Sequence, residues 1–184
     1  MLNNIFSVGI STFKLSIDNQ PLIEYAKQTT KINKKKEFRD ILTNPIFNEL
    51  NEIVLIKMND YFKSIWNNNY NMKLNEAWTN VGPDIAITIP HVHTESFLSA
   101  VYYPKAEDGE LIFLNPNVST ISHQLTQMIG SHNPYTAEYH AVPSRSGILV
   151  IFNSMLQHMV RCNNNDRISV AYNGTPEVKD EKKI

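Results

Sequence analysis

The sequence contains a single cysteine, Cys162, among its 184 residues. One cysteine excludes a framework of internal disulfides and a zinc site built from several cysteines, and it leads us to expect a reducing, cytoplasmic location. A dominant charge sign is also missing, because 17 basic side chains stand against 18 acidic ones, for a formal net charge of −1. Non-specific binding to a phosphate backbone needs a basic surface. Nucleic acid is therefore not an expected partner.

Long apolar runs are absent as well. No stretch approaches the roughly 20 residues that a membrane-spanning helix requires, and residues 1–4 lack the basic and apolar regions of a signal peptide. We expect no membrane partner. The hydrophobic share of 42% and the charged share of 19% are typical of a globular domain, and the length predicts one domain, or one domain with an extension.

A helical pattern dominates the middle of the N-terminal part. Between Phe47 and Ile65, apolar residues recur at spacings of three and four, which predicts a helix over 44–66 with one apolar face. Asn44 followed by Pro45 suits the start of such a helix, because asparagine caps the first turn and proline is accepted within it. We expect this apolar face to pack against the core.

Beyond residue 75 the pattern changes to short β-rich segments separated by turn residues. The expected strands are 76–81, 85–91, 96–103, 111–114, 137–141, 147–152, 157–162 and 167–172. About eight short strands at this spacing predict a mainly β fold, a sandwich or barrel of the jelly-roll type.

This change of pattern divides the chain into three expected parts. Residues 1–74 are expected to supply one or two strands (within 5–17) and supporting helices, residues 75–174 the β core, and residues 175–184 a charged, flexible tail. The long polar segment 115–137 is either a lid over the core or an ordered insertion.

Two histidines stand one residue apart at the end of an expected strand. Side chains at positions i and i+2 of a strand point to the same face, so His91 and His93 can both reach one metal ion. Glu95 has the same parity and offers a carboxylate oxygen, if the strand continues that far. A surface strand whose polar side chains face water is the alternative interpretation of such a pair.

Two further residues strengthen the metal hypothesis. His158 lies in an apolar strand, where a polar side chain needs a partner. Nine residues later Arg167 opens the strand Arg167–Tyr172, and its side chain shares a face with Ser169. A guanidinium inside a small barrel must meet an anion, and its planar fork suits a carboxylate. That anion is either a protein carboxylate or a ligand, to which the Ser169 hydroxyl could also bond.

Several motifs together resemble one enzyme superfamily. The motifs are His91-Val-His93, Leu98-Ser-Ala-Val-Tyr-Tyr103, Gly109-Glu-Leu-Ile-Phe113, Pro143-x-x-x-Gly147-Ile-Leu-Val-Ile-Phe152-x-Ser-x-x-x-His158 and Arg167-Ile-Ser169. In order and spacing they resemble the iron(II)- and 2-oxoglutarate-dependent oxygenases. The similarity is greatest to the small bacterial and phage group named putative 2OG-Fe(II) oxygenases, and more distant to prolyl hydroxylases. It covers Trp78 to Asn173, about half of the chain.

The resemblance implies a double-stranded β-helix, a cupin-like barrel with Fe(II) at its open end and with 2-oxoglutarate and dioxygen as small-molecule partners. His91 matches the first histidine ligand and His158 the distal one. Arg167, helped by Ser169, matches the group that pairs with the far carboxylate of 2-oxoglutarate, and Tyr103 matches a supporting hydroxyl. The implied activity is that of a dioxygenase of hydroxylase type, which couples oxidative decarboxylation of 2-oxoglutarate to succinate with C–H oxidation of an unidentified substrate. No catalytic residue beyond the metal ligands is implied.

The sequence departs from the family pattern at position 93. The broader pattern is HxD or HxE, whereas this chain has His-Val-His. Either His93 replaces the carboxylate, or the motif is His93-Thr-Glu95 and His91 is a neighbour. We favour His91, His93 and His158 as the metal ligands, with Glu95 as the alternative carboxylate ligand.

Two other functions compete with this one. The first is a cupin-like metal-binding protein, whose pattern places a glutamate four or five residues after the second histidine. Those positions are Phe97 and Leu98, so the match fails there. The second is a non-catalytic jelly-roll binding module, which leaves the inward arginine and the histidines unexplained.

Overall fold

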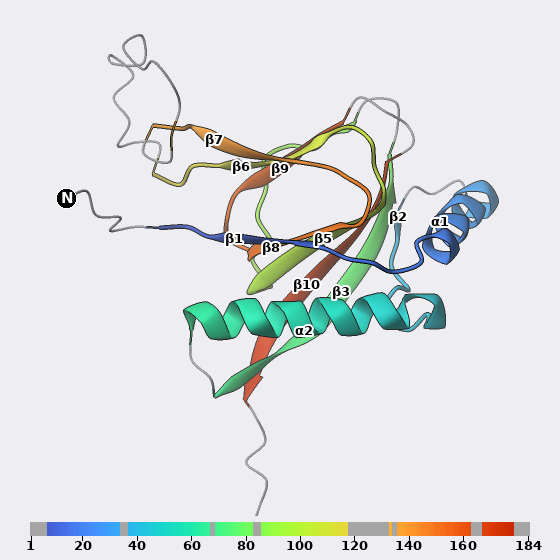
Figure 1. Ribbon diagram of the computed structural model, residues 1–184, viewed down its shortest axis with the longest axis horizontal. Coiled ribbons are helices and arrows are strands. Elements are labelled where there is room, and N and C mark those ends of the chain that lie inside the picture. Colours follow the sequence, from blue (N-terminus) through green and yellow to red (C-terminus); the bar gives the residue numbers. More distant parts are fainter. Residues whose placement is uncertain are drawn as a thin grey trace, which may run out of the picture.

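The computed structural model describes residues 7–33, 37–66, 69–82, 86–117, 133, 136–162 and 167–178. Two α-helices, a short 3-10 helix and ten strands make up this part of the chain (Figure 1). The helical elements are α1 (Gln20–Asn33), η1 (Pro45–Phe47) and α2 (Asn48–Ile65). The strands are β1 (Ile10–Lys14), β2 (Glu37–Phe38), β3 (Tyr70–Val81), β4 (Ala86–Ile87), β5 (Leu98–Lys105), β6 (Glu110–Leu114), β7 (Tyr139–Pro143), β8 (Ile148–Asn153), β9 (His158–Cys162) and β10 (Ile168–Val178).

Two antiparallel sheets face each other. The larger has six strands in the order β1-β8-β5-β10-β3-β2, and the smaller has four in the order β4-β9-β6-β7. Because β5 and β8 pair within one sheet while β6 and β9 pair within the other, the chain crosses repeatedly between the sheets. This arrangement confirms the expected double-stranded β-helix of the jelly-roll class.

Strand alternation separates the residues of the large sheet into two cores. In β5, Tyr102 joins the core beneath the helices, whereas Tyr103 joins the core between the sheets. In β10, Val170 and Tyr172 likewise face the helices. The Tyr172 hydroxyl donates a hydrogen bond to Asn51 Oδ1 in α2 at 2.9 Å, which ties this sheet to its helical cover.

Helix α2 lies across the outer face of the six-stranded sheet (Figure 1). The predicted apolar face is confirmed by Leu50, Val54 and Met58, which are all buried. Ile65 is the exception, with 50% of its surface exposed. The helix ends at Ile65, and Trp66 packs against Phe62 in its place, with ring centroids 5.5 Å apart.

Each of the eight expected strands has a counterpart, and the largest differences from the expected boundaries are in β3, β4 and β10. Strand β4 is limited to two residues, since the chain leaves the sheet before Pro90 and returns only as an isolated bridge at His91. Strand β10 continues past Tyr172 to Val178, because β3 begins at Tyr70 and supplies a partner along that whole length. The first residues of the expected tail therefore belong to the sheet, and residues 179–184 lie outside the described part.

The N-terminal segment contributes to the large sheet as well as to its cover. Strand β1 pairs antiparallel with β8, from Ile10 opposite Phe152 to Lys14 opposite Ile148. Helix α1 is one of the supporting helices expected in this part of the chain. The expected division of the chain at residue 74 stays a prediction. Residues 118–132, which hold most of the expected lid, lie outside the described residues.

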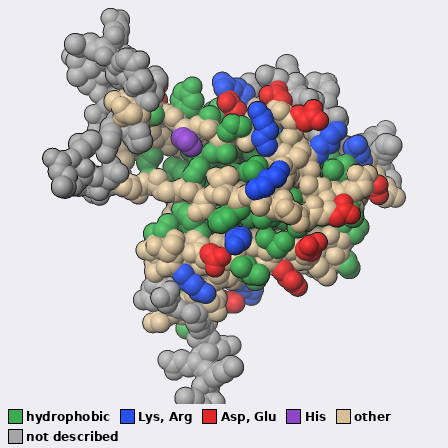
Figure 2. All heavy atoms as spheres, viewed as in Figure 1, with side chains coloured by type: hydrophobic (Ala, Val, Ile, Leu, Met, Phe, Trp, Pro, Cys, Tyr) green, Lys and Arg blue, Asp and Glu red, His purple; other side chains and the backbone are tan. Residues whose placement is uncertain are grey.

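Basic and acidic side chains are interspersed over the face seen in Figure 2, as the near-zero net charge suggests. Within the described part of the chain, neither helix has the length and apolarity that crossing a membrane requires.

Candidate metal centre

The three histidines singled out by the sequence come together between the two sheets. His91 and His158 form an isolated antiparallel bridge, in which each backbone N–H donates to the other's carbonyl, at 2.9 and 3.0 Å. The backbone N–H of His93 donates to the Ser154 carbonyl at 2.9 Å, in the turn between β8 and β9. The chain around the His-Val-His motif is thus fixed by main-chain bonds to the segment that carries His158.

Hydrogen bonds select the tautomer of two of these rings. His91 Nδ1 lies 2.8 Å from the Ile89 carbonyl oxygen, and His158 Nδ1 lies 2.8 Å from that of Leu156. A carbonyl oxygen can only accept, so each Nδ1 carries the hydrogen and each Nε2 keeps its lone pair. Carbonyl acceptors of this kind commonly orient metal-binding histidines.

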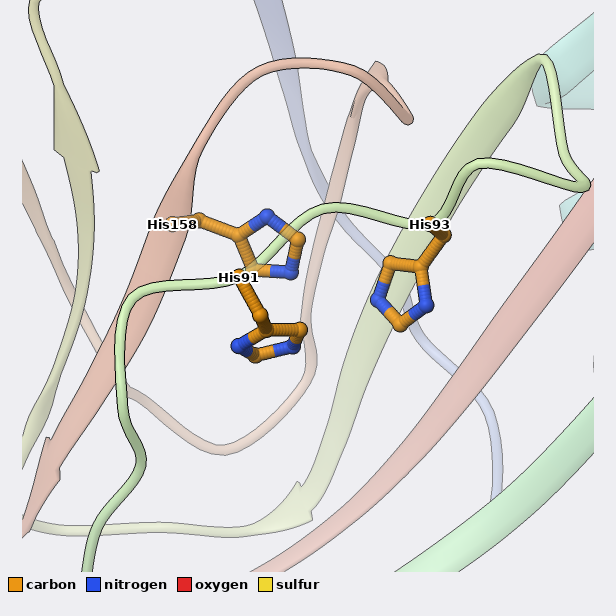
Figure 3. A group of neighbouring side chains, drawn as sticks. All are labelled: His91, His93 and His158. Carbon is orange, nitrogen blue, oxygen red and sulfur yellow. The ribbon is translucent and has the colours of Figure 1, made fainter.

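The three rings turn toward one another (Figure 3). Ring centroids are 4.4 Å apart for His91 and His158, 5.1 Å for His91 and His93, and 5.2 Å for His93 and His158. One donor atom from each residue lies within 4.8 Å of the other two. Three nitrogens that share a metal at about 2.1 Å stand about 3 Å apart. Small side-chain rotations would therefore close the set around an ion.

Glu95 lies apart from this group. It is exposed in a turn after the histidine motif, and among the described residues the metal-competent cluster consists of the three histidines without it. The strand parity that would have brought Glu95 to the same face is lost because the chain is not a strand between Val92 and Phe97. The geometry thus gives an all-nitrogen donor set, which suits iron, zinc, copper or nickel.

Burial favours the neutral form of His93 and His158. Burial, together with the nearby His91 and His93, lowers the pKa of His158 from 6.5 to about 4, while the bond to Leu156 acts the other way. Burial also lowers the pKa of His93, as does the nearby His91, and Glu76 opposes both. A neutral imidazole is the form that binds a metal.

We expect the metal-free protein to lose stability as the pH falls from 7 to 5. The unfolded chain protonates His158 near 6.5 whereas the folded chain resists protonation until about 4, so the unfolded state takes up the proton first. Linkage then lowers the free energy of unfolding by about 2 kcal/mol over this range. Urea denaturation at several pH values measures the slope. The His158→Gln variant should lose most of it, and an unchanged slope in that variant would contradict the assignment.

A cavity of about 440 Å³ opens beside the histidines. Its walls carry apolar side chains from both sheets together with polar ones from β3 and β10. Arg167 and Ser169 reach it from the start of β10 and are both buried. The backbone carbonyl of Arg167 accepts from the Gly82 N–H at 2.8 Å, which holds this end of the strand in place. The structure therefore brings the expected arginine and serine to the same cavity as the histidines.

Arg167 has an unusual environment for a cation. It is only 5% exposed, its Nε lacks a hydrogen-bond partner, and in the described part of the chain no carboxylate forms an ion pair with it. Its guanidinium lies 5.0 Å from the centroid of the Tyr103 ring, and the buried Tyr103 hydroxyl also lacks a partner. Buried polar groups without a partner are rare in folded proteins, and a ligand that bonds to them would explain their presence. The Arg167 guanidinium and the Tyr103 hydroxyl are both groups that can donate hydrogen bonds to an incoming carboxylate.

Behind His93 lies a row of polar residues that sequence patterns alone did not indicate. Ser99 of β5, Ser154 of the β8–β9 turn and Asn173 of β10 are all buried and hydrogen-bonded to one another. Part of their signal was present, because Ser99 interrupts an apolar stretch of sequence and Asn173 directly follows one. That these residues bond to one another could not be inferred without knowing that β5 pairs with β10, which places Ser99 opposite Asn173.

Comparison with known families gives one match. Residues 76–173 match the model of a family described as "Putative 2OG-Fe(II) oxygenase". That span is 98 of 184 residues, slightly more than half of the chain. A search of curated protein sequences finds no significant match.

Solved structures share the fold at low sequence identity. AviO1 from Streptomyces viridochromogenes superimposes with a TM-score of 0.62 at 11% identity, covering 95% of this chain and 91% of that one. A prolyl-4-hydroxylase from Pseudomonas putida gives 0.58 at 15% identity, with 91% and 87% covered. HygX from Streptomyces hygroscopicus, solved with nickel and 2-oxoglutarate bound, gives 0.56 at 13% identity, with 92% and 82% covered.

Proposed function

The chain belongs to the putative 2OG-Fe(II) oxygenases, and from this premise we propose that it is a hydroxylase whose iron is held by three histidines. Membership makes Fe(II) and 2-oxoglutarate its cofactor and cosubstrate. When bound, they supply the oxidation of a substrate C–H bond, coupled to decarboxylation of 2-oxoglutarate to succinate. We assign the iron to His91, His93 and His158, and the far carboxylate of 2-oxoglutarate to Arg167 with Ser169 and Tyr103.

One observation carries this proposal. A single cavity is lined both by the three histidines and by a buried arginine that has no carboxylate partner in the described part of the chain. A metal explains the convergence of three neutral imidazoles, and an anionic ligand explains the buried cation. The dicarboxylate 2-oxoglutarate links the two, because one end can chelate a metal while the other pairs with a guanidinium.

The side chains of this protein have two tasks in such a reaction. Arg167 fixes the far carboxylate with its planar fork, and Ser169 can donate a hydroxyl to the same group. Leu111, Phe152 and Val160 line the cavity with apolar surface, which keeps bulk water away from the reacting atoms. Trp78 and Asn80 line it from β3.

The donor set alters the charge at the centre. Three neutral imidazoles leave the full double positive charge of the metal, whereas the usual two histidines and one carboxylate cancel part of it. A dianionic cosubstrate is favoured by the greater charge. We therefore expect affinity for 2-oxoglutarate to depend strongly on the metal, and to be weak in the metal-free protein.

Anaerobic addition of Fe(II) and then 2-oxoglutarate is expected to produce a visible charge-transfer band that saturates with 2-oxoglutarate. The band arises only when the keto acid chelates the iron, so it tests metal and cosubstrate together without a prime substrate. Succinate, which lacks the keto group, should compete without producing a band. Fe(II) binding with no band would favour a cupin-like metal protein, and absence of metal binding would refute the proposed function.

A further inference from the structure

A chain of buried hydrogen bonds lies behind His93. Ser154 Oγ is 2.9 Å from Ser99 Oγ, and the Ser99 hydroxyl donates to Asn173 Oδ1 at 2.8 Å. Asn173 Nδ2 is 3.5 Å from His93 Nδ1. The first three residues are at most 3% exposed, so water does not compete for these bonds. The orientation of one candidate metal ligand is therefore set by side chains from two other strands and a turn.

The donor-to-acceptor direction of these hydrogen bonds does not suit a His93 that binds a metal through Nε2. His91 and His158 already carry hydrogen on Nδ1, which leaves Nε2 for the ion. If His93 does the same, its Nδ1–H faces the amide hydrogens of Asn173, and two donors meet. With the amide as placed, His93 Nδ1 accepts, and Nε2 carries the hydrogen instead. That tautomer has no lone pair directed at the metal.

A half-turn of the Asn173 amide removes the conflict. Oδ1 then accepts from His93 Nδ1–H, and Nδ2 donates to Ser99 Oγ. A hydroxyl can both donate and accept, so Ser99 passes its own hydrogen to Ser154 Oγ. Only the amide oxygen and nitrogen of Asn173 exchange places, while the direction of each bond reverses. Two serines in series are what such a reversal requires, because a carbonyl in either place would fix one direction.

We propose that Asn173 is a positioning residue for His93, and that metal binding reverses the Ser154–Ser99–Asn173–His93 chain. The inference rests on the proposed function, since it takes His93 as a ligand. Glu76 permits the change. Its Oε2 is 3.4 Å from Asn173 Nδ2, but its side chain is 45% exposed and paired with Arg39. It can therefore move aside when the amide oxygen turns toward it.

Nitrogen NMR of the unmodified protein tests the reversal directly. Imidazole ¹⁵N shifts distinguish a nitrogen that carries hydrogen from one that does not. In the metal-free protein we expect the hydrogen of His93 on Nε2, and after addition of Zn²⁺ on Nδ1. His91 and His158 should carry it on Nδ1 in both states, which makes them internal controls. A His93 that already carries hydrogen on Nδ1 without metal would overturn the reversal.

Variants test the positioning role through Co²⁺ affinity and the visible spectrum of the bound Co²⁺. Asn173→Ala should lose roughly 10- to 100-fold in affinity, the usual effect of removing the partner of a metal-binding histidine, and should change the spectrum. Asn173→Asp should retain affinity, because a carboxylate offers an acceptor to His93 Nδ1–H without turning. Equal losses in both variants would overturn the proposal.

Asn51→Ala is the matched control. Asn51 accepts a hydrogen bond from the Tyr172 hydroxyl and donates one to the Ile41 carbonyl. Tyr172 faces the helices, on the side of β10 opposite to Asn173. The variant therefore loses side-chain hydrogen bonds comparable to those that a change at Asn173 would remove, without contacting a histidine. Its Co²⁺ affinity and spectrum should stay unchanged. If the unmodified protein binds neither Zn²⁺ nor Co²⁺, the proposed function fails as well. If it binds them with no change of tautomer, this inference alone fails.

Discussion

The His158→Ala variant is expected to lose metal affinity by roughly a hundred- to a thousandfold. Sites with four ligands bind zinc with about 10–16 kcal/mol, or about 3 kcal/mol or more for each ligand. Removing one of three ligands should therefore reduce occupancy to a small fraction at micromolar metal, and the iron-dependent charge-transfer band should vanish with it. Calorimetric titration with Co²⁺ measures the affinity without requiring turnover.

Two further variants separate the alternative ligand sets. His93→Ala should lose as much affinity as His158→Ala, because both rings belong to the cluster within 4.8 Å. Glu95→Gln should bind metal as the unmodified protein does, since Glu95 lies exposed in a turn outside that cluster. The opposite result, a loss of metal affinity in Glu95→Gln and little change in His93→Ala, would favour Glu95 as the ligand in place of His93.

The parts of this fold that follow local rules were predictable. The buried face of α2 is set by helical spacing, and the shared face of Arg167 and Ser169 is set by strand alternation. His158 stood out because a polar side chain in an apolar strand needs a partner. In each case the physical constraint acts between residues that are close in the sequence.

Contacts between distant segments were not predictable in the same way. Ser99 and Asn173 are 74 residues apart, and nothing local says that β5 and β10 are neighbours. The length of β10 was underestimated because it is set by its partner β3, not by its own composition. Glu95 was kept as a possible ligand because strand parity was extended past Val92, where hydrogen bonding to β9 had already ended.

Replacement of Arg167 by methionine is expected to weaken binding of 2-oxoglutarate and to stabilise the protein without ligand. Losing one partner of a desolvated charge pair costs about 2–5 kcal/mol, or roughly 30- to 5,000-fold in affinity. Without the anion, however, the arginine is a buried cation with an unpartnered Nε. An apolar side chain of similar length removes that cost, and the melting temperature should rise by about 2–4 °C for each kcal/mol gained.

The opposite signs of these two effects make the experiment decisive. Mn²⁺ can replace iron, so that 2-oxoglutarate affinity and thermal unfolding are measured without turnover. An arginine that serves packing alone would destabilise the protein when replaced and leave ligand affinity largely unchanged. Arg161→Met provides the comparison, because Arg161 is exposed and paired with Glu110 on the neighbouring strand, and both quantities should stay close to those of the unmodified protein. A stabilised variant that has lost its ligand identifies Arg167 as a cation kept for binding at the expense of stability.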